Sequence, residues 1–301
     1  MTKELFTKQL KERLEELTEC VVEIHTTTKN NGIKLESLTI MREGKNTYPT
    51  IYIDIWWDIY NKGESFENII TKVLEWERKS AVNKEIDLDF FMDFNQVKEK
   101  LRYKIINTEK NLDLLNSIPH KDFLDLSKVY MVEVYTPQIG NGTIMIHNKH
   151  LEMWGTKPEE IDRYAAEQTE KHNPYCILPI EKVVKNIVTE LAGTEETIPE
   201  FTMPPMEMYV LTNREKYLGA SVLLYQNVLK NFAKEKKDDI YILPSSTHEL
   251  ILIPARVVWY TGIKHLKEMV KEVNSTQVEP EEFLSDNVYM YNRFTDKIEI
   301  V

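Results

Sequence analysis

The stretch Tyr241-Ile242-Leu243-Pro244-Ser245-Ser246-Thr247-His248-Glu249-Leu250-Ile251-Leu252-Ile253 decides the fold class. Residues 240–243 and 248–253 have the length and composition of strands. Pro244 and two serines lie between them and predict a corner, because proline donates no backbone hydrogen bond. Residues 250–253 are all apolar, so both faces of the second strand must be buried. This stretch therefore predicts two strands joined by a corner, the second of them central in its sheet.

Helices and strands alternate irregularly around this stretch. A strand at 208–212 and a helix starting at Val228 precede it, while a helix at 259–273 and a closing hairpin at 289–301 follow. The order lacks the regular strand–helix–strand rhythm of a doubly wound parallel sheet. We therefore expect an α+β protein with mixed or antiparallel sheets and packed helices.

The first 80 residues predict the order α-β-β-β-α. An amphipathic helix capped by Thr2 opens the chain, and Asn31-Gly32 predicts the turn of a hairpin. Alternating isoleucines and polar or aromatic residues predict a strand over 48–59, before a helix that begins at Phe66. We expect an N-terminal α+β module over 1–105 and a larger C-terminal α+β module over 106–301. Residues 194–205, with three prolines and three glutamates, are the best linker candidate.

Composition limits the classes of partner. The 301 residues contain 38 Lys and Arg against 49 Asp and Glu, which gives a net charge of −11. Because a nucleic-acid-binding protein normally carries a basic surface, we expect no nucleic-acid partner. No stretch of about 18 uncharged apolar residues predicts a membrane span. Cys20 and Cys176 lie far apart and form no CxxC motif. With no signal peptide apparent at the start, we expect a cytoplasmic protein.

Ser246, His248 and Glu249 bring a hydroxyl, an imidazole and a carboxylate within four residues. A hydrolase-type enzyme could use the histidine as general base and the serine as nucleophile. However, neighbouring residues of a strand point to opposite faces, so His248 and Glu249 would diverge. The other interpretation is structural, with the serines closing the turn and His248 held at the entrance of the strand. A pocket that joined His248 to polar groups of Thr212, Asn213 and Ser221 would favour the enzyme.

Tandem tryptophans, Trp56 and Trp57, suggest a binding surface. If they lie on a strand, they face opposite ways, so one of them is expected at a protein–protein or homodimer surface. Base stacking is poorly supported, because no basic groove accompanies these aromatic side chains.

Two groups of residues resemble metal ligands only superficially. His147 and His150 with Glu152 lack a further ligand, and cap or turn roles fit them better. Asp87, Asp89 and Asp93 lack the central glycine of a calcium loop, and a solvated acidic edge is favoured. We expect neither a metal nor a cofactor.

Three segments carry a resemblance to known sequences: Met208–Asn213, Leu218–Tyr225 and Tyr241–Glu249. They resemble a domain-of-unknown-function family of Gram-positive anaerobic bacteria. A related uncharacterised bacillar family shares the pattern LTN…GAS…LPSS.HE. The resemblance runs from about residue 125 to 255. It implies no activity, so no catalytic residue can be carried over.

Two function hypotheses follow from these observations. The first is a non-enzymatic binding, adaptor or regulatory protein that recognises another protein, with Trp56, Trp57, Thr212 and Asn213 as candidate binding residues. The alternative is a hydrolase with a cleft around Ser246, His248 and Glu249. Whether the protein is an enzyme therefore stays open at the level of sequence.

Overall fold

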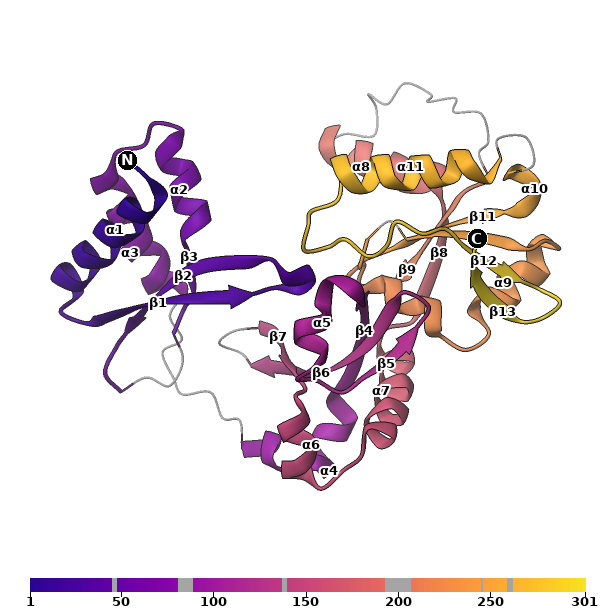
Figure 1. Ribbon diagram of the computed structural model, residues 1–301, viewed down its shortest axis with the longest axis horizontal. Coiled ribbons are helices and arrows are strands. Elements are labelled where there is room, and N and C mark those ends of the chain that lie inside the picture. The colour runs from indigo at the N-terminus through magenta and orange to yellow at the C-terminus, as the bar shows by residue number, and fades with distance from the viewer. Residues whose placement is uncertain (45–47, 81–88, 137–139, 193–206, 245, 259–261) are drawn as a thin grey trace. The chain divides into compact units, whose positions relative to one another are not determined.

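The computed structural model describes the chain except for residues 45–47, 81–88, 137–139, 193–206, 245 and 259–261 (Figure 1). The chain divides into two compact units. Unit 1 comprises Met1–Met92 with Val134–Gly142, and unit 2 comprises Asp93–Glu133 with Thr143–Val301. Antiparallel sheets and packed helices confirm the α+β class. The expected linker at 194–205 lies outside the described residues.

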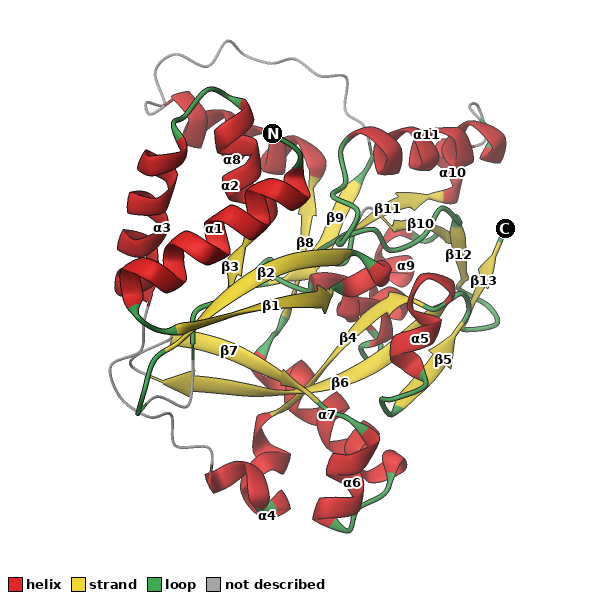
Figure 2. Ribbon diagram, turned by 60° about the vertical axis from the view of Figure 1, so that its left-hand side comes forward, coloured by secondary structure: helices red, strands yellow, loops and turns green. Residues whose placement is uncertain are grey.

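Unit 1 packs three helices on a three-stranded sheet of order β1-β2-β3 (Figure 2). Its elements are α1 (Lys3–Thr18), β1 (Val21–Thr28), β2 (Lys34–Met41), β3 (Ile51–Tyr52), α2 (Ile53–Asn61) and α3 (Phe66–Ser80). Apolar side chains from all three helices and the sheet form one core, including Phe6, Leu10, Leu38, Ile53 and Ile70. This core is the chief stabilising feature of unit 1, since burying a large aliphatic side chain contributes roughly 1.5–3 kcal/mol.

Local sequence signals explain how unit 1 begins. Thr2 caps α1, as expected, by accepting a hydrogen bond from the backbone N–H of Leu5. The β1–β2 hairpin turns at Asn31 and Gly32, both of which have positive φ, the conformation for which an Asn-Gly pair is selected.

The expected strand over 48–59 is wrong. Only Ile51 and Tyr52 are extended, and the chain then enters helix α2. In the helix, Ile53, Trp57 and Tyr60 follow a 3.6-residue period and pack against the Phe6 core. The β-branched and aromatic residues that favour a strand in isolation are overridden by this tertiary packing.

A small sheet, in which β6 lies between β4 and β5 and β7 also pairs with β6, belongs mainly to unit 2, while residues 134–142 of β6 and β7 are assigned to unit 1. Helix α7 packs against β4, where Thr169 Oγ1 accepts a hydrogen bond from the N–H of Tyr103. The elements around this sheet are α4 (Phe94–Val97), β4 (Leu101–Asn107), α5 (Leu112–Leu115), β5 (His120–Phe123), β6 (Leu126–Thr136), β7 (Gly140–Met145), α6 (Asn148–Trp154) and α7 (Pro158–His172). The expected module boundary at 105/106 lies within β4.

Five short 3-10 helices connect these elements among the described residues: η1 (Asn30–Gly32), η2 (Asp89–Met92), η3 (Lys98–Lys100), η4 (Glu109–Asn111) and η6 (Gly219–Leu224).

The second sheet of unit 2 has six antiparallel strands in the order β13-β12-β10-β11-β9-β8. Helices α8 and α11 lie over one face and α9 lies on the other (Figure 1). The elements are β8 (Tyr175–Pro179), α8 (Ile180–Ala192), β9 (Tyr209–Asn213), α9 (Val228–Lys236), β10 (Ile240–Pro244), β11 (Leu250–Pro254), α10 (Ala255–Val258), α11 (Ile263–Thr276), β12 (Tyr289–Asn292) and β13 (Lys297–Ile300).

The prediction of a central, doubly covered strand is confirmed. β11 pairs with β10 on one side and β9 on the other. Leu252 is fully buried on the α9 face, and Ile253 lies in the core beneath α11. Pro244 differs slightly from expectation, because β10 continues through it before the corner.

Asp125 connects the two sheets of unit 2. Its carboxylate accepts hydrogen bonds from Ser285, Asn287 and Tyr289, at distances of 2.5–2.9 Å. Because Asp125 belongs to the β5–β6 turn and Tyr289 to β12, these bonds hold the small sheet against the larger one.

Candidate functional site

The residues singled out in the C-terminal sequence meet in one junction between β9 and β11. Thr212 Oγ1 donates a hydrogen bond of 2.7 Å to the backbone oxygen of His248. Asn213 holds the loop that follows β9, because its side chain donates to the oxygen of Tyr217 and accepts from the N–H of Tyr217. Both residues are buried. The expected proximity of Thr212, Asn213 and His248 is therefore present.

Both ring nitrogens of His248 are engaged within this junction. Nδ1 accepts a hydrogen bond of 3.0 Å from the N–H of Leu218, and Nε2 lies 3.2 Å from Glu282 Oε1. Ser246 Oγ accepts from the backbone N–H of His248 at 3.0 Å. In this arrangement neither ring nitrogen is free to take a proton from a nucleophile.

Glu249 has a carboxyl group with a raised pKa. Burial raises the pKa of its carboxyl group, and the nearby His248 and Lys216 offset part of that effect. Within the described chain its carboxylate makes no hydrogen bond or ion pair. Its ionised form is therefore disfavoured by the surrounding protein.

Gly219 shows how tightly the junction is filled. A Cβ atom added at Gly219 would meet Thr212 Oγ1, and would lie 2.5 Å from the backbone oxygen of His248 and 2.8 Å from the backbone nitrogen of Asn213. Ser221, two residues further on, donates to the oxygen of Leu218. The polar groups that were expected to line a cleft are instead packed against one another, and His248 lines none of the cavities of about 270, 400 and 430 Å³ in the described chain.

Trp56 and Trp57 lie on helix α2 rather than on a strand, and both are half-buried. The Trp57 ring packs 5.3 Å from the ring of Phe6 and stacks on Tyr60 at 5.7 Å. Both tryptophans adjoin the core of unit 1. The alternation of faces expected for a strand therefore does not apply to them.

The candidate metal ligands have local structural roles. The N–H of His147 donates to Nδ1 of His150 at 3.1 Å, which caps helix α6. Asp93 caps α4 by accepting from the N–H of Asn95. Asp87 lies outside the described residues. Among the residues the structure describes, no group of three potential ligands is arranged to hold a metal ion.

A groove of about 400 Å³ lies between β8 and α9, and sequence analysis did not find it. The side chains of Tyr175, Ile177 and Pro179, on one face of β8, form one wall. The other wall comes from β9 and α9 and includes Tyr209, Val228, Asn231, Phe232, Glu235 and Lys236. The rings of Tyr209 and Phe232 meet edge to face, 5.1 Å apart. Three aromatic side chains thus line the groove.

The groove opens at the free edge of the six-stranded sheet. Ile180 N–H donates to Met208, and Arg214 N–H to Pro174, so the even-numbered residues of β8 hydrogen-bond to β9. The backbone groups of Tyr175, Ile177 and Pro179 point outward. Within the described chain β8 has no second neighbouring strand, and these outward N–H and C=O groups form no hydrogen bond.

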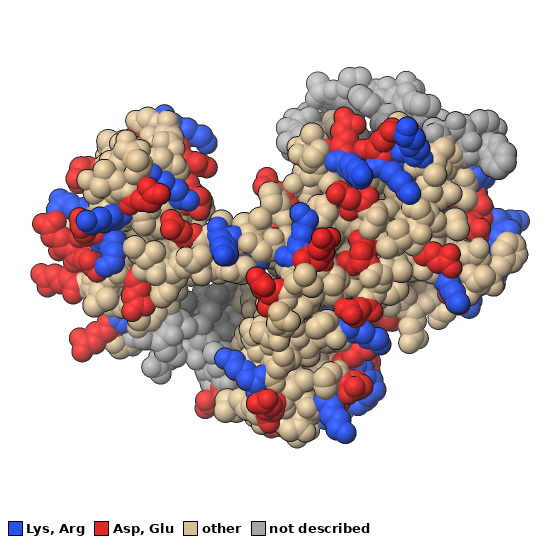
Figure 3. Space-filling view, in the orientation of Figure 1, with Lys and Arg blue, Asp and Glu red and all other residues tan. Residues whose placement is uncertain are grey.

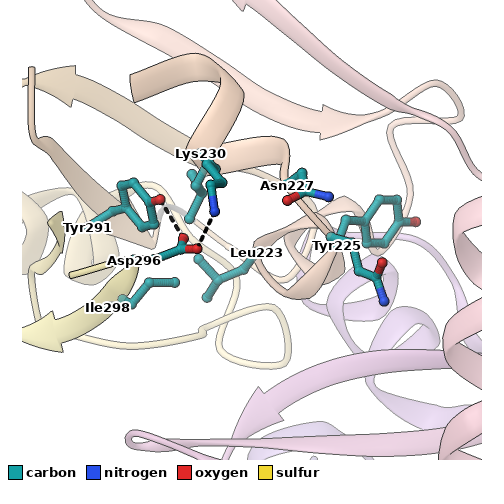
Figure 4. Close-up of a pocket in the computed structure, with 9 residues that line it drawn as sticks. Leu223, Tyr225, Asn227, Lys230, Tyr291, Asp296 and Ile298 are labelled. Atoms are coloured by element: carbon teal, nitrogen blue, oxygen red, sulfur yellow. Dashed lines mark hydrogen bonds and ion pairs between the residues drawn. The ribbon is translucent and has the colours of Figure 1, made fainter. Parts of the chain in front are cut away.

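A second cavity, of about 270 Å³, lies between α9 and the β12–β13 hairpin (Figure 4). Asp296 occupies its side, where it accepts hydrogen bonds from Lys230 at 2.7 Å and Tyr291 at 2.6 Å. A third cavity borders Asp125, whose carboxylate is already hydrogen-bonded to three side chains. In both cavities the carboxylate, Asp296 in one and Asp125 in the other, already accepts hydrogen bonds from neighbouring side chains.

Surface charge does not single out another site on the face shown in Figure 3, where acidic and basic side chains are interspersed. Among the described helices, none combines the length and apolarity needed to cross a bilayer.

A protein-family model described as "Family of unknown function (DUF5688)" matches residues 3–293, nearly the whole chain. No curated protein and no solved structure matches.

Proposed function

Because this chain belongs to the family of unknown function DUF5688, we propose a function from its own geometry: it is a non-enzymatic protein that binds an extended segment of another protein along β8. The observation that carries this proposal is the coincidence, among the described residues, of an unpaired strand edge with an aromatic groove on the same strand. Addition of a strand to a sheet edge is an established mode of peptide recognition.

The backbone of β8 sets what the bound segment must offer. Tyr175 and Ile177 each provide an outward N–H and C=O, whereas Pro179 provides only a C=O. An added antiparallel strand can therefore form five hydrogen bonds, two donated by β8 and three accepted by it. These bonds supply affinity without reading sequence.

Backbone bonds alone give weak binding. Each contributes about 0.5–1.5 kcal/mol net, while association costs at least about 4 kcal/mol in lost freedom. The surplus must come from side chains of the bound segment that enter the groove. Directly opposed residues of an antiparallel pair share a face, so the residues opposite Tyr175, Ile177 and Pro179 would face α9. Every second residue of the segment is therefore selected.

Two other edge strands of the described chain, β1 and β13, differ from β8. On β1, the outward N–H of Val22 is already occupied by Glu15 Oε1 at 3.1 Å, which blunts that edge. On β13, at the opposite edge of the six-stranded sheet, the adjoining cavity of about 270 Å³ is smaller than the β8 groove of about 400 Å³. Both free cysteines, Cys20 and Cys176, fit an interaction in the reducing cytoplasm.

The test begins with a displayed library of random heptapeptides, selected against the full chain. Enriched peptides should lose at least about tenfold in affinity with Ile177→Lys, because a charge replaces an apolar wall of the groove. Ile300→Lys, the same change on the opposite edge strand, is the matched control and should bind normally.

A second variant separates backbone pairing from side-chain packing. Ile177→Pro removes an outward donor and leaves the bonds to β9 in place, since those come from Cys176 and Leu178. It should weaken binding, and circular dichroism should show that the fold persists. Enrichment of no peptide, or equal affinity for the native chain and both Ile177 variants, would overturn the proposal.

A further inference from the structure

We infer that the β8 groove selects a segment with a carboxylate opposite Pro179, and that Lys236 is the residue that binds it; this inference rests on the proposed function. Lys236 is the last residue of α9 and lines the groove. Its Nζ lies 4.2 Å from the ring centroid of Tyr209 and 5.2 Å from that of Phe232. A charged group thus lies among the aromatic side chains of the groove.

The present partner of Lys236 is weakly held. Within the described chain its ion pair is with Glu235 Oε1 at 2.9 Å, and the Glu235 side chain is 69% exposed. An ion pair to so exposed a carboxylate contributes little stability, so exchanging it costs little. The Lys236 side chain itself is only 17% exposed. A ligand carboxylate that reached it would be shielded from water and bound more strongly than Glu235.

The side chain of Lys236 is protonated at neutral pH. Burial tends to lower the pKa of its ammonium group, but hydrogen bonds with Tyr209 and Glu235 outweigh burial and raise it. An ammonium group has three donors, of which Tyr209 and the exposed Glu235 engage two. One donor therefore remains for a bound carboxylate, and exchange of Glu235 would free a second.

Strand register places the carboxylate along the bound segment. Tyr209 lies directly opposite Pro179, so the segment residue opposite Pro179 continues the same row across the sheet. Neighbouring strands lie about 4.8 Å apart, which puts that residue about 10 Å from the Tyr209 backbone, on the face where Lys236 covers the ring. The combined side chains of lysine and glutamate can span this distance.

The direction of the segment completes the recognition pattern. Every strand of this sheet pairs antiparallel, and antiparallel pairing is slightly the more stable. An antiparallel segment meets Pro179 first, then Ile177 and Tyr175. Its sequence should therefore run acidic–any–apolar–any–apolar from the N-terminus.

The probe is the peptide Thr-Glu-Thr-Val-Thr-Tyr-Thr with both ends blocked, and its partner is the same peptide with Gln in place of Glu. Titration calorimetry with the full chain should show the Glu peptide binding about threefold or more tightly. The difference should shrink with added salt.

Two variants assign the effect. Lys236→Met keeps an unbranched apolar stem over Tyr209, and should bind the two peptides equally. Lys234→Met, an exposed residue of the same helix, is the matched control and should retain the preference.

The outcomes separate the two claims. Equal binding of both peptides by the native chain, together with loss of binding in Ile177→Lys, overturns the role of Lys236 and leaves the proposed function standing. A preference for Glu that survives Lys236→Met does the same. Binding of neither peptide to the native chain overturns both claims.

Discussion

Replacing Gly219 by alanine should destabilise unit 2 by about 3 kcal/mol, because the new methyl group has no space. Its nearest neighbours would be Thr212 Oγ1, the His248 oxygen at 2.5 Å and the Asn213 nitrogen at 2.8 Å. Two of these three atoms belong to backbone and cannot rotate away. The three segments of the junction must therefore separate.

The magnitude follows from three contributions. Overpacking costs about 1–3 kcal/mol, towards the upper end when backbone must move. Loss of the Thr212–His248 hydrogen bond adds about 1 kcal/mol. Alanine restricts the unfolded chain and returns about 0.4–1 kcal/mol. For a unit of about 200 residues, a net loss near 3 kcal/mol lowers Tm by roughly 6–12 °C.

Calorimetry of the full chain measures this change, with the transition of unit 2 identified by hydrogen exchange at β9 and β11. Gly142→Ala, which lies in unit 1, is the control: its new Cβ would meet only Val134 O, at 3.9 Å, so the transition of unit 2 should be unchanged. Thr212→Ala added to Gly219→Ala should recover part of the loss. A Gly219→Ala protein that unfolds within 1 °C of the native chain would refute the reasoning.

Three further predictions follow from buried or electrostatically strained groups. Leu252→Asp should unfold unit 2, because it places an unpaired charge on the fully buried face of β11, and a native circular dichroism spectrum would contradict this. Glu77→Ala should lower the free energy of unfolding of unit 1 by about 2–4 kcal/mol, measured by urea unfolding. The reason is that Glu77 is buried and accepts two hydrogen bonds from Arg42, at 2.8 and 2.7 Å. Glu75→Ala, at an exposed residue of the same helix, is the control. Glu249→Gln should stabilise unit 2 at about pH 7. Burial raises the folded pKa of Glu249 above its unfolded value of 4.5, so ionisation above that range favours the unfolded chain, and the gain should vanish at about pH 3.

Much of the fold follows from local sequence signals. The Thr2 cap, the Asn31-Gly32 turn and the doubly apolar 250–253 segment each specify their structure with few neighbours, and each prediction is confirmed. The strand expected over 48–59 failed because its residues satisfy two periods at once. Ile53 and Trp57 fit a helix face as well as an alternating pattern, and contact with Phe6 decides between them.

The candidate site shows a different limit. The sequence predicts that Thr212 and Asn213 lie near His248, as they do, but it could not distinguish an open cleft from a packed junction. That distinction depends on the Leu218 and Glu282 groups that occupy the imidazole, and Glu282 lies 34 residues away in sequence. The β8 groove was missed for a related reason. The alternation of Tyr175, Ile177 and Pro179 is visible, but sequence does not show that β8 ends the sheet.

The strand order of the six-stranded sheet also bears on synthesis of the chain. β9 lies between β8 and β11, so its second neighbour is made only after β10. Roughly 40 residues separate the end of β9 from the end of β11, which corresponds to about 2–8 s at ribosomal rates of about 5–20 residues per second. During that interval the nascent β8–β9 pair has two open edges instead of one. A chaperone that binds exposed strand edges would therefore find two of them during this interval, at β8 and at β9, and within the described sheet only the edge at β8 once β11 has paired with β9.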